Sequence, residues 1–347
     1  MIDSVATVDG IAALQLPSGM IPWFPGGHCD PWNHVETAMA LSVGGRCAEA
    51  ERAYAWLAET QNHDGSWFNY YTADDVEDYR LDTNVVAYVA VGVWHHFLVT
   101  GDEGFLRSMW PTVERALDFV VRLQRPTGEI LWCIEPDLTP GRFALLTGSS
   151  SIYLSLRCGA AAADRLGRQR PDWELAAGRL AHAIAYAPEA FEPKERWAMD
   201  WYYPVLCGAV RGVAGQARLL EQWDTFVMAG LGVRCVSDRP WVTAAETAEC
   251  VMALDAVGLH DHARTLFAWA QHLRHDDGMY WTGCVYPQAV HFPGGERSSY
   301  TAAAVVLAAD ALFGLTPAAG LFRGDGLPAG LDLDADPSPF WSADPAL

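Results

Sequence analysis

The chain alternates between segments with apolar residues at steps of three and four and polar stretches rich in glycine. In one such segment Ala50, Ala53 and Leu57 are spaced in this way, and Gly44 and Gly45 separate it from the segment before. This spacing is typical of one face of an α-helix, and glycine commonly ends a helix. The pattern predicts helices over residues 33–44, 47–61, 82–99, 104–124, 148–166, 173–187, 204–214, 216–229, 243–257, 260–274 and 298–313, with a short helix before residue 16.

Helices of this number form about six hairpins. Alternation of β-branched residues is scarce, and the connections over 62–81, 125–147, 188–203, 230–242 and 275–297 are long, which is typical of functional loops. We therefore expect an all-α fold, an (α/α)6 toroid in which the hairpins form a ring and the long loops surround one pocket. It is expected to be a single domain over residues 1–320, followed by a Pro/Gly/Asp-rich tail over 321–347.

A pattern of glutamine, glycine and tryptophan recurs where helical segments end. It occurs as Gln15, Gly19 and Trp23; Gln61, Gly65 and Trp67; Gln124, Gly128 and Trp132; and Gln271, Gly278 and Trp281. Recurrence of this kind indicates a structural unit that is used several times. Glycine permits a tight reversal, tryptophan fills the space between hairpins and glutamine bonds to loose backbone groups. We interpret the pattern as structural rather than catalytic.

Composition narrows the classes of function. Hydrophobic residues make up 51% of the 347 residues, enough for a large core, and the formal net charge of −20 disfavours a nucleic-acid partner or an anionic membrane surface. The chain has no apolar run long enough to span a membrane and no basic secretory start, so we expect a cytoplasmic protein. Its eight cysteines are far apart, which favours neither a disulfide framework nor a metal cluster. The oligomeric state stays open.

Two family resemblances support the toroid. The segment AYAWLAETQNHDGSW resembles the QW motif of triterpene cyclases, which are α/α toroids related in fold to the protein prenyltransferases. Four blocks, beginning CDPWNHVETAMALSVGG, YRLDTNVVAYVAVGVWHHF, GEILWCIEPDL and YPQAVHFPGGERSSY, are similar in order to segments of the six-hairpin glycosidases, especially the bacterial glucoamylase family. This resemblance implies an inverting glycoside hydrolase. The chain departs from the family at both catalytic carboxylates, because Cys133 follows Trp132 where the family has its general acid, and the stretch YWTG over 280–283 has no carboxylate where the family has its general base.

Two carboxylates are candidates for catalysis, because hydrolysis of a glycosidic bond usually needs one protonated and one ionised carboxyl group. Glu135 lies near Trp132 in a loop, where partial burial would raise its pKa, and is the predicted acid. Glu296 follows two glycines before the last helix and is the predicted base. A solvated loop residue at Glu135, and a helix-start acid or a partner of Arg297 at Glu296, fit the sequence as well.

Polar and aromatic residues near helix starts are predicted to bind the sugar. Carboxylates and amides supply acceptors and donors for hydroxyls, and aromatic rings stack on C–H faces. The predicted binding residues are Asp30, His34, Glu36, Arg80, Asp82, Asn84, Trp132, Asp200, Trp201, Glu246 and Trp281. Asp30 and Asp82 also fit helix N-caps. A metal site of His28, Asp30 and His34 is a weaker alternative, and no metal or cofactor is predicted.

The favoured function is a glycoside hydrolase-like enzyme acting on a small glycoside or oligosaccharide by acid/base hydrolysis with two carboxylates. The first alternative is a terpene cyclase or prenyltransferase-like enzyme, because DDVED over 74–78 resembles a Mg²⁺–diphosphate motif. A solvated acidic turn explains those residues as well, and only Arg80 is near to pair with a diphosphate. The third hypothesis is a non-catalytic sugar-binding toroid.

Overall fold

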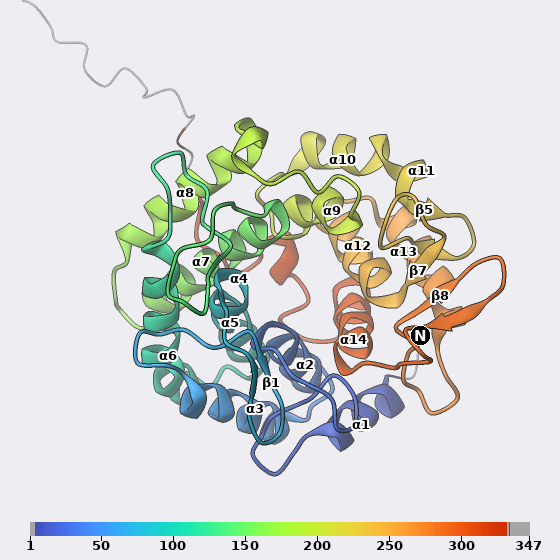
Figure 1. Ribbon diagram of the computed structural model, residues 1–347, viewed down its shortest axis with the longest axis horizontal. Coiled ribbons are helices and arrows are strands. Elements are labelled where there is room, and N and C mark those ends of the chain that lie inside the picture. Colours follow the sequence, from blue (N-terminus) through green and yellow to red (C-terminus); the bar gives the residue numbers. More distant parts are fainter. Residues whose placement is uncertain (1–3, 332, 334–347) are drawn as a thin grey trace, which may run out of the picture.

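The computed structural model, which describes residues 4–331 and 333, is a closed ring of helical hairpins (Figure 1). The inner helices are α2 (Pro31–Val43), α4 and α5 (Thr83–Ala87 and Val89–Thr100), α7 (Leu146–Arg165), α9 (Ala198–Leu206), α12 (Ala244–Ala256) and α14 (Ser299–Phe313). Each packs against the next around the ring, and α14 packs against α2. The predicted (α/α)6 toroid is therefore confirmed.

The outer helices pack against the outside of the inner ring. They are α3 (Cys47–Thr60), α6 (Glu103–Val121), α8 (Pro171–Tyr186), α10 (Gly212–Glu221) with the short α11 (Trp223–Phe226), and α13 (His260–Ala270). The first helix, α1 (Val5–Leu14), packs against the last inner helix, α14, so the first and last α-helices of the described residues complete one hairpin. Outer helices bury one face only: in α6, Leu106, Trp110, Val113 and Leu117 are buried at steps of three and four.

Short antiparallel strands tie the long loops together. The pairs are β1 (Tyr70–Tyr71) with β2 (Val76–Asp78), β3 (Leu81–Asp82) with β4 (Cys133–Ile134), β5 (Val227–Met228) with β6 (Gly232–Val233), and β7 (Trp241–Thr243) with β8 (Gly283–Val285), which also pairs with β9 (Val290–Phe292). In the second pair Asp82 lies opposite Cys133. Strands of two or three residues carry no periodic signal, so the sequence did not predict them.

Helix α9 begins earlier than predicted. The expected start at Pro204 is wrong, because Pro204 lies inside the helix. A proline there cannot donate to the carbonyl four residues before it, which is that of Asp200. The Arg218 guanidinium donates to this carbonyl instead, at 2.7 Å, and so satisfies the acceptor that the proline leaves open.

The recurrent glutamines pair with backbone groups, as expected. The Gln61 amide donates to the carbonyls of Gly65 and Thr112, both at 2.9 Å, and so joins its own turn to α6. Gln15 and Gln124 make the same pair of bonds in their own repeats, to Gly19 and Glu49 and to Gly128 and Ala176. The tryptophans do not repeat in this way. Trp67 is fully buried, whereas those of the other three repeats are partly exposed.

The chain continues to pack beyond residue 320, where the tail was predicted to begin. Leu321 and Phe322 are buried, and the Arg157 guanidinium donates to the carbonyl of Pro328. Of the predicted tail, positions 332 and 334–347 lie outside the described residues. Among the helices that are described, none has the length and apolar character needed to cross a membrane.

Candidate active site

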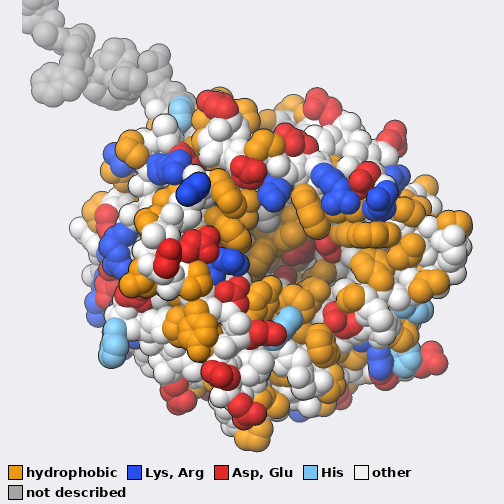
Figure 2. Space-filling view, in the orientation of Figure 1, with side chains coloured by type: hydrophobic (Ala, Val, Ile, Leu, Met, Phe, Trp, Pro, Cys, Tyr) orange, Lys and Arg blue, Asp and Glu red, His pale blue; other side chains and the backbone are white. Residues whose placement is uncertain are grey.

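The ring is hollowed at the end where its inner helices begin (Figure 2). The space-filling view shows acidic side chains at the bottom of the hollow and apolar side chains around it. One part is a cavity of about 260 Å³ whose lining includes Trp32, Trp132, Trp197, Leu145 and Met199. The polar members of the lining are Asp82, Asn84, Thr147, Lys194 and Asp200.

Four carboxylates reach this end from the starts of four inner helices. Asp30 and Asp82 are the N-caps of α2 and α4, and Asp200 and Glu246 lie in the first turns of α9 and α12. A carboxylate at a helix start is stabilised by the free N–H groups there. The ring brings the helix starts together, so residues far apart in the sequence meet at one end of the fold.

The two capping aspartates are firmly held. Asp30 accepts hydrogen bonds from the Asn33 backbone at 2.9 Å, and from the Asn33 amide and the Trp23 indole at 2.8 Å. Asp82 accepts bonds from the backbone N–H groups of Asn84 and Val85 and from the Trp132 indole. Burial raises the pKa of Asp30 and raises that of Asp82 to about 6, against the lowering effect of these donors. Both residues are thus caps of helices that begin at this end of the ring, and Asp82 also lines the cavity.

Asp200 and Glu246 are less tightly held. The Thr147 hydroxyl donates to Asp200 at 2.6 Å, and burial raises the pKa of Asp200. Burial also raises the pKa of Glu246. The charge of Glu246 contributes to the raised pKa values of Tyr202 and Tyr300, after burial, so both phenols lie near this carboxylate.

Asp30 and Glu246 are connected by one aromatic wall. The Trp23 indole, which donates to Asp30, packs edge-on against the Tyr300 ring with 4.8 Å between centroids. Tyr300 in turn lies near Glu246. The two carboxylates therefore border the same wall, although 216 positions separate them in the sequence numbering.

A second acidic group lies deeper in the ring. Glu249, one helical turn after Glu246, accepts bonds from the hydroxyls of Tyr202 and Tyr203, and burial raises its pKa to about 7. Glu36 is 4% exposed, and its pKa is raised by burial and then by the charges of Glu249 and Asp30. The structure thus places Glu36 below the helix starts, close to a second buried carboxyl.

Two predicted binding residues belong to the core instead. The His34 ring nitrogens lie 3.2 Å from the Ile21 amide and 2.9 Å from the Ala53 carbonyl, and burial lowers its pKa to about 4. This leaves His34 neutral, with both nitrogens engaged. Trp201 is buried, stacks on Phe226 and donates to the Arg218 carbonyl. Neither side chain lines the cavity.

The two predicted catalytic residues lie apart from the cavity lining. Glu135 is 38% exposed, accepts a bond from Arg80 at 3.2 Å and lines a separate surface depression with Tyr79 and Leu138. Arg80 also lies over the Trp132 ring, 5.1 Å from its centroid. This pairing explains why Glu135 stays at the rim.

Glu296 lies on the other side of the rim, where the chain enters α14. It accepts a hydrogen bond from the Thr282 hydroxyl at 3.1 Å, and burial raises its pKa. It lines a groove beside α1 rather than the cavity around Asp82. Trp281 is near this groove and stacks on His291 with 4.2 Å between centroids.

The sequence did not single out several residues that form the site. Trp32 follows Asp30 directly, and Lys194 and Trp197 lie in a long connection that was expected to be functional. Trp23 was interpreted only as a structural part of the recurrent pattern, and Tyr300 was not singled out, because nothing local shows that the two rings meet. Of the DDVED acids, in contrast, Asp74 and Asp75 are exposed in the turn between β1 and β2, and Glu77 and Asp78 belong to β2.

No family model matches the chain. The chain is 54% identical over 332 residues to the MMP endo-(1,4)-3-O-methyl-alpha-D-mannosidase of Mycolicibacterium hassiacum, a match that covers 95% of this chain and 91% of that protein. A solved structure of the GH63 mannosylglycerate hydrolase from Thermus thermophilus in complex with glucose has a TM-score of 0.69 at 13% identity, covering 88% of this chain and 99% of that one.

A further solved structure, a glycosidase variant in complex with glucose, has a TM-score of 0.68 at 16% identity and covers 90% of this chain and 96% of that one. Identities this low show the fold alone. Fold and sequence together define a glycoside hydrolase of the six-hairpin glycosidase superfamily. Within that class, the chain belongs to the family of the Mycolicibacterium hassiacum mannosidase. The predicted class of enzyme is thereby confirmed.

Proposed function

We propose that the protein is an endo-acting hydrolase of (1,4)-linked 3-O-methyl-α-D-mannosides. The observation that carries the proposal is the 54% identity to a mannosidase with this specificity, over 95% of the chain. The cytoplasmic location expected from the sequence stays a prediction.

The cavity lining supports a methylated substrate. Trp32, Trp197, Leu145 and Met199 present apolar surface, and neither Leu145 nor Met199 has a donor for a sugar hydroxyl. A hydroxyl buried against such surface without a partner costs roughly 1–3 kcal/mol, whereas a methyl ether has no donor to leave unpaired. The site is therefore expected to favour a methylated position over a free hydroxyl.

For the chemistry, we propose Glu246 as general acid and Asp30 as general base. Burial raises the pKa of Glu246 and so favours its protonated form, which can give its proton to the leaving oxygen as the glycosidic C–O bond breaks. Burial raises the pKa of Asp30, but the three donors around it oppose this effect and favour its ionised form, which can take a proton from the water that attacks the anomeric carbon. The alternative pair is the one predicted from the sequence, with Glu135 as acid and Glu296 as base.

The polar groups that line the cavity are proposed to bind the sugar. Asp82 and Asp200 supply acceptors, Lys194 supplies a donor, and Asn84 supplies both. The buried Asn84 side-chain oxygen has no hydrogen-bond partner among the described residues, which suits an acceptor held for a ligand hydroxyl.

The substrate proposal is tested by incubating the purified protein with α-(1,4)-linked mannooligosaccharides of one length, with and without 3-O-methyl groups. We expect cleavage at internal linkages, and a kcat/KM for the methylated series at least about tenfold higher, which corresponds to about 1.4 kcal/mol. Release of single sugars from one end would contradict endo action. Equal rates for both series would contradict the role of the apolar lining.

The pH dependence of kcat/KM should show an acidic limb near pH 6. Because the pKa of Asp82 is raised to about 6, this carboxyl is ionised above that pH and accepts sugar hydroxyls, and it is protonated below. Activity should then fall about tenfold per pH unit below 6. In Asp82→Asn, which keeps a capping side chain, the limb should move away from pH 6. If the acidic limb stays near pH 6 in this variant, the limb reports the titration of another carboxyl.

A further inference from the structure

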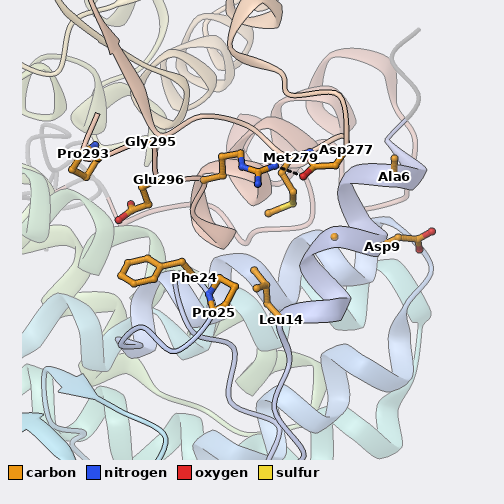
Figure 3. Close-up of a pocket in the computed structure, with 13 residues that line it drawn as sticks. Ala6, Asp9, Leu14, Phe24, Pro25, Asp277, Met279, Pro293, Gly295 and Glu296 are labelled. Carbon is orange, nitrogen blue, oxygen red and sulfur yellow. Dashed lines mark hydrogen bonds and ion pairs between the residues drawn. The ribbon is translucent and has the colours of Figure 1, made fainter. Parts of the chain in front are cut away.

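A groove crosses the rim of the ring outside the cavity (Figure 3). Its volume is about 820 Å³, against about 260 Å³ for the cavity around Asp82. It lies between α1 and the turn over 293–297 that leads into α14. In the close-up, Phe24 and Glu296 lie at one end of the groove, and Ala6 and Asp9 of α1 lie at the other.

The groove begins where the catalytic end of the ring stops. Trp23 bonds to Asp30 in the site, while the next residue, Phe24, lines the groove. His28 joins the two, with its ring centroid 4.4 Å from that of Trp23 and 6.2 Å from that of Phe24. On the facing segment, Glu296 lines the groove. Its charge contributes to the raised pKa of Tyr300, so Glu296 also lies near the aromatic wall. A chain that leaves the site over His28 would enter the groove directly.

The lining suits an uncharged carbohydrate. Phe24, Leu14, Met279 and Pro293 supply apolar surface for the C–H faces of sugar rings. The acids of the groove are mostly neutralised, because Asp9 pairs with Arg46 and Asp277 pairs with Arg297. These pairs can accept and donate hydrogen bonds to hydroxyls without selecting a charged ligand. The net charge of −20 also disfavours a polyanion.

We propose that this groove is an accessory carbohydrate site, which holds the part of the polysaccharide that extends beyond the catalytic cavity. The inference rests on the proposed endo-acting function, since an enzyme that cleaves inside a chain must accommodate sugar units on both sides of the bond. Two linked sites bind one long ligand more tightly than either binds a short one, because the second contact forms within the complex. Affinity should therefore rise with chain length.

The test is Phe24→Ala assayed on methylated oligosaccharides of two lengths, one confined to the cavity and one long enough to reach the groove. We expect kcat/KM to fall about tenfold for the long substrate, the size of one lost aromatic contact, and to change less than about twofold for the short one. Tyr186→Ala, which removes an exposed aromatic ring from α8 outside the groove lining, is the control and should leave both substrates unchanged. Equal losses on both lengths would overturn the accessory site.

Binding separates this inference from the proposed reaction. Calorimetry on Glu246→Gln, with and without Phe24→Ala, should show tighter binding of the long oligosaccharide and loss of that advantage when Phe24 is removed. If the wild-type protein hydrolyses none of the substrates but binding still shows this dependence on length and Phe24, the reaction proposal fails and the groove stands. Affinity that does not depend on length rejects the groove.

Discussion

Replacing Glu246 with glutamine is expected to lower kcat about 1,000-fold while the protein stays folded. The amide has nearly the shape of the carboxyl group but cannot transfer a proton to the leaving oxygen, and general acid catalysis typically contributes 10²–10⁴-fold. Glu246 lies in the first turn of α12 with its carboxyl near Tyr202 and Tyr300, and burial raises its pKa. The measurement is kcat on a methylated α-(1,4)-mannooligosaccharide, with circular dichroism to check folding.

Matched variants distinguish the two proposed roles. Asp30→Asn keeps a side chain able to cap α2 but removes the base, so its activity should fall by a similar factor. An activated aryl mannoside needs little help from an acid, so Glu246→Gln should recover much of its rate on that substrate and Asp30→Asn should not. Recovery in Asp30→Asn alone would reverse the roles.

Controls at the rim test the competing pair. Glu135→Gln and Glu296→Gln should each reduce kcat less than about tenfold, because Glu135 pairs with Arg80 at the surface and Glu296 lines the groove beside α1. A loss of about 1,000-fold in either variant, with an active Glu246→Gln, would support the catalytic residues predicted from sequence and reject the pair proposed from the structure.

The ring was predictable because its signal is local and repeated. Helix α3 was expected over 47–61 and is found over Cys47–Thr60, since its apolar residues follow the helical period. Gln61 could also be interpreted correctly, because a glutamine at a helix exit lies beside unpaired backbone groups and the next outer helix supplies a carbonyl at Thr112. Each of these features depends on a few neighbouring residues and on the recurrence of the unit.

The site was only partly predictable because its geometry depends on contacts between hairpins. The four carboxylates at the starts of the inner helices were all chosen as sugar binders, but the role of the acid was assigned to Glu135 because it follows Trp132 closely. The pairing of β3 with β4 sets Asp82 opposite Cys133, and the Trp132 indole then bonds to Asp82 while Glu135 bonds to Arg80. A two-residue strand pair has no sequence signature that could have shown this.

The glycine of the recurrent glutamine–glycine–tryptophan pattern is expected to be important for the stability of the fold, as the catalytic acid is for activity. Gly65 has φ +98°, and a Cβ at this position would lie 2.2 Å from the Arg115 carbonyl of α6. Gly65→Ala should destabilise the fold by about 3–5 kcal/mol: about 1–2 from the left-handed backbone, and the rest from displacing α6 and straining the Gln61 bond to Thr112. Chemical denaturation measures this loss.

Gly45→Ala is the matched control, because Gly45 also has a positive φ, of +75°, but a Cβ there meets no atom within 4 Å. Its loss should be only the backbone cost, about 1–2 kcal/mol. Equal losses at both glycines would mean that α6 yields easily and that the close approach is not what requires glycine. If the loss of stability is larger at Gly65, we expect similar losses at Gly19 and Gly128, because a Cβ at these positions would meet the carbonyls of Arg52 and Arg179 in the same way. The recurrent motif would then be explained by outer helices that pack directly against the turn of the preceding hairpin.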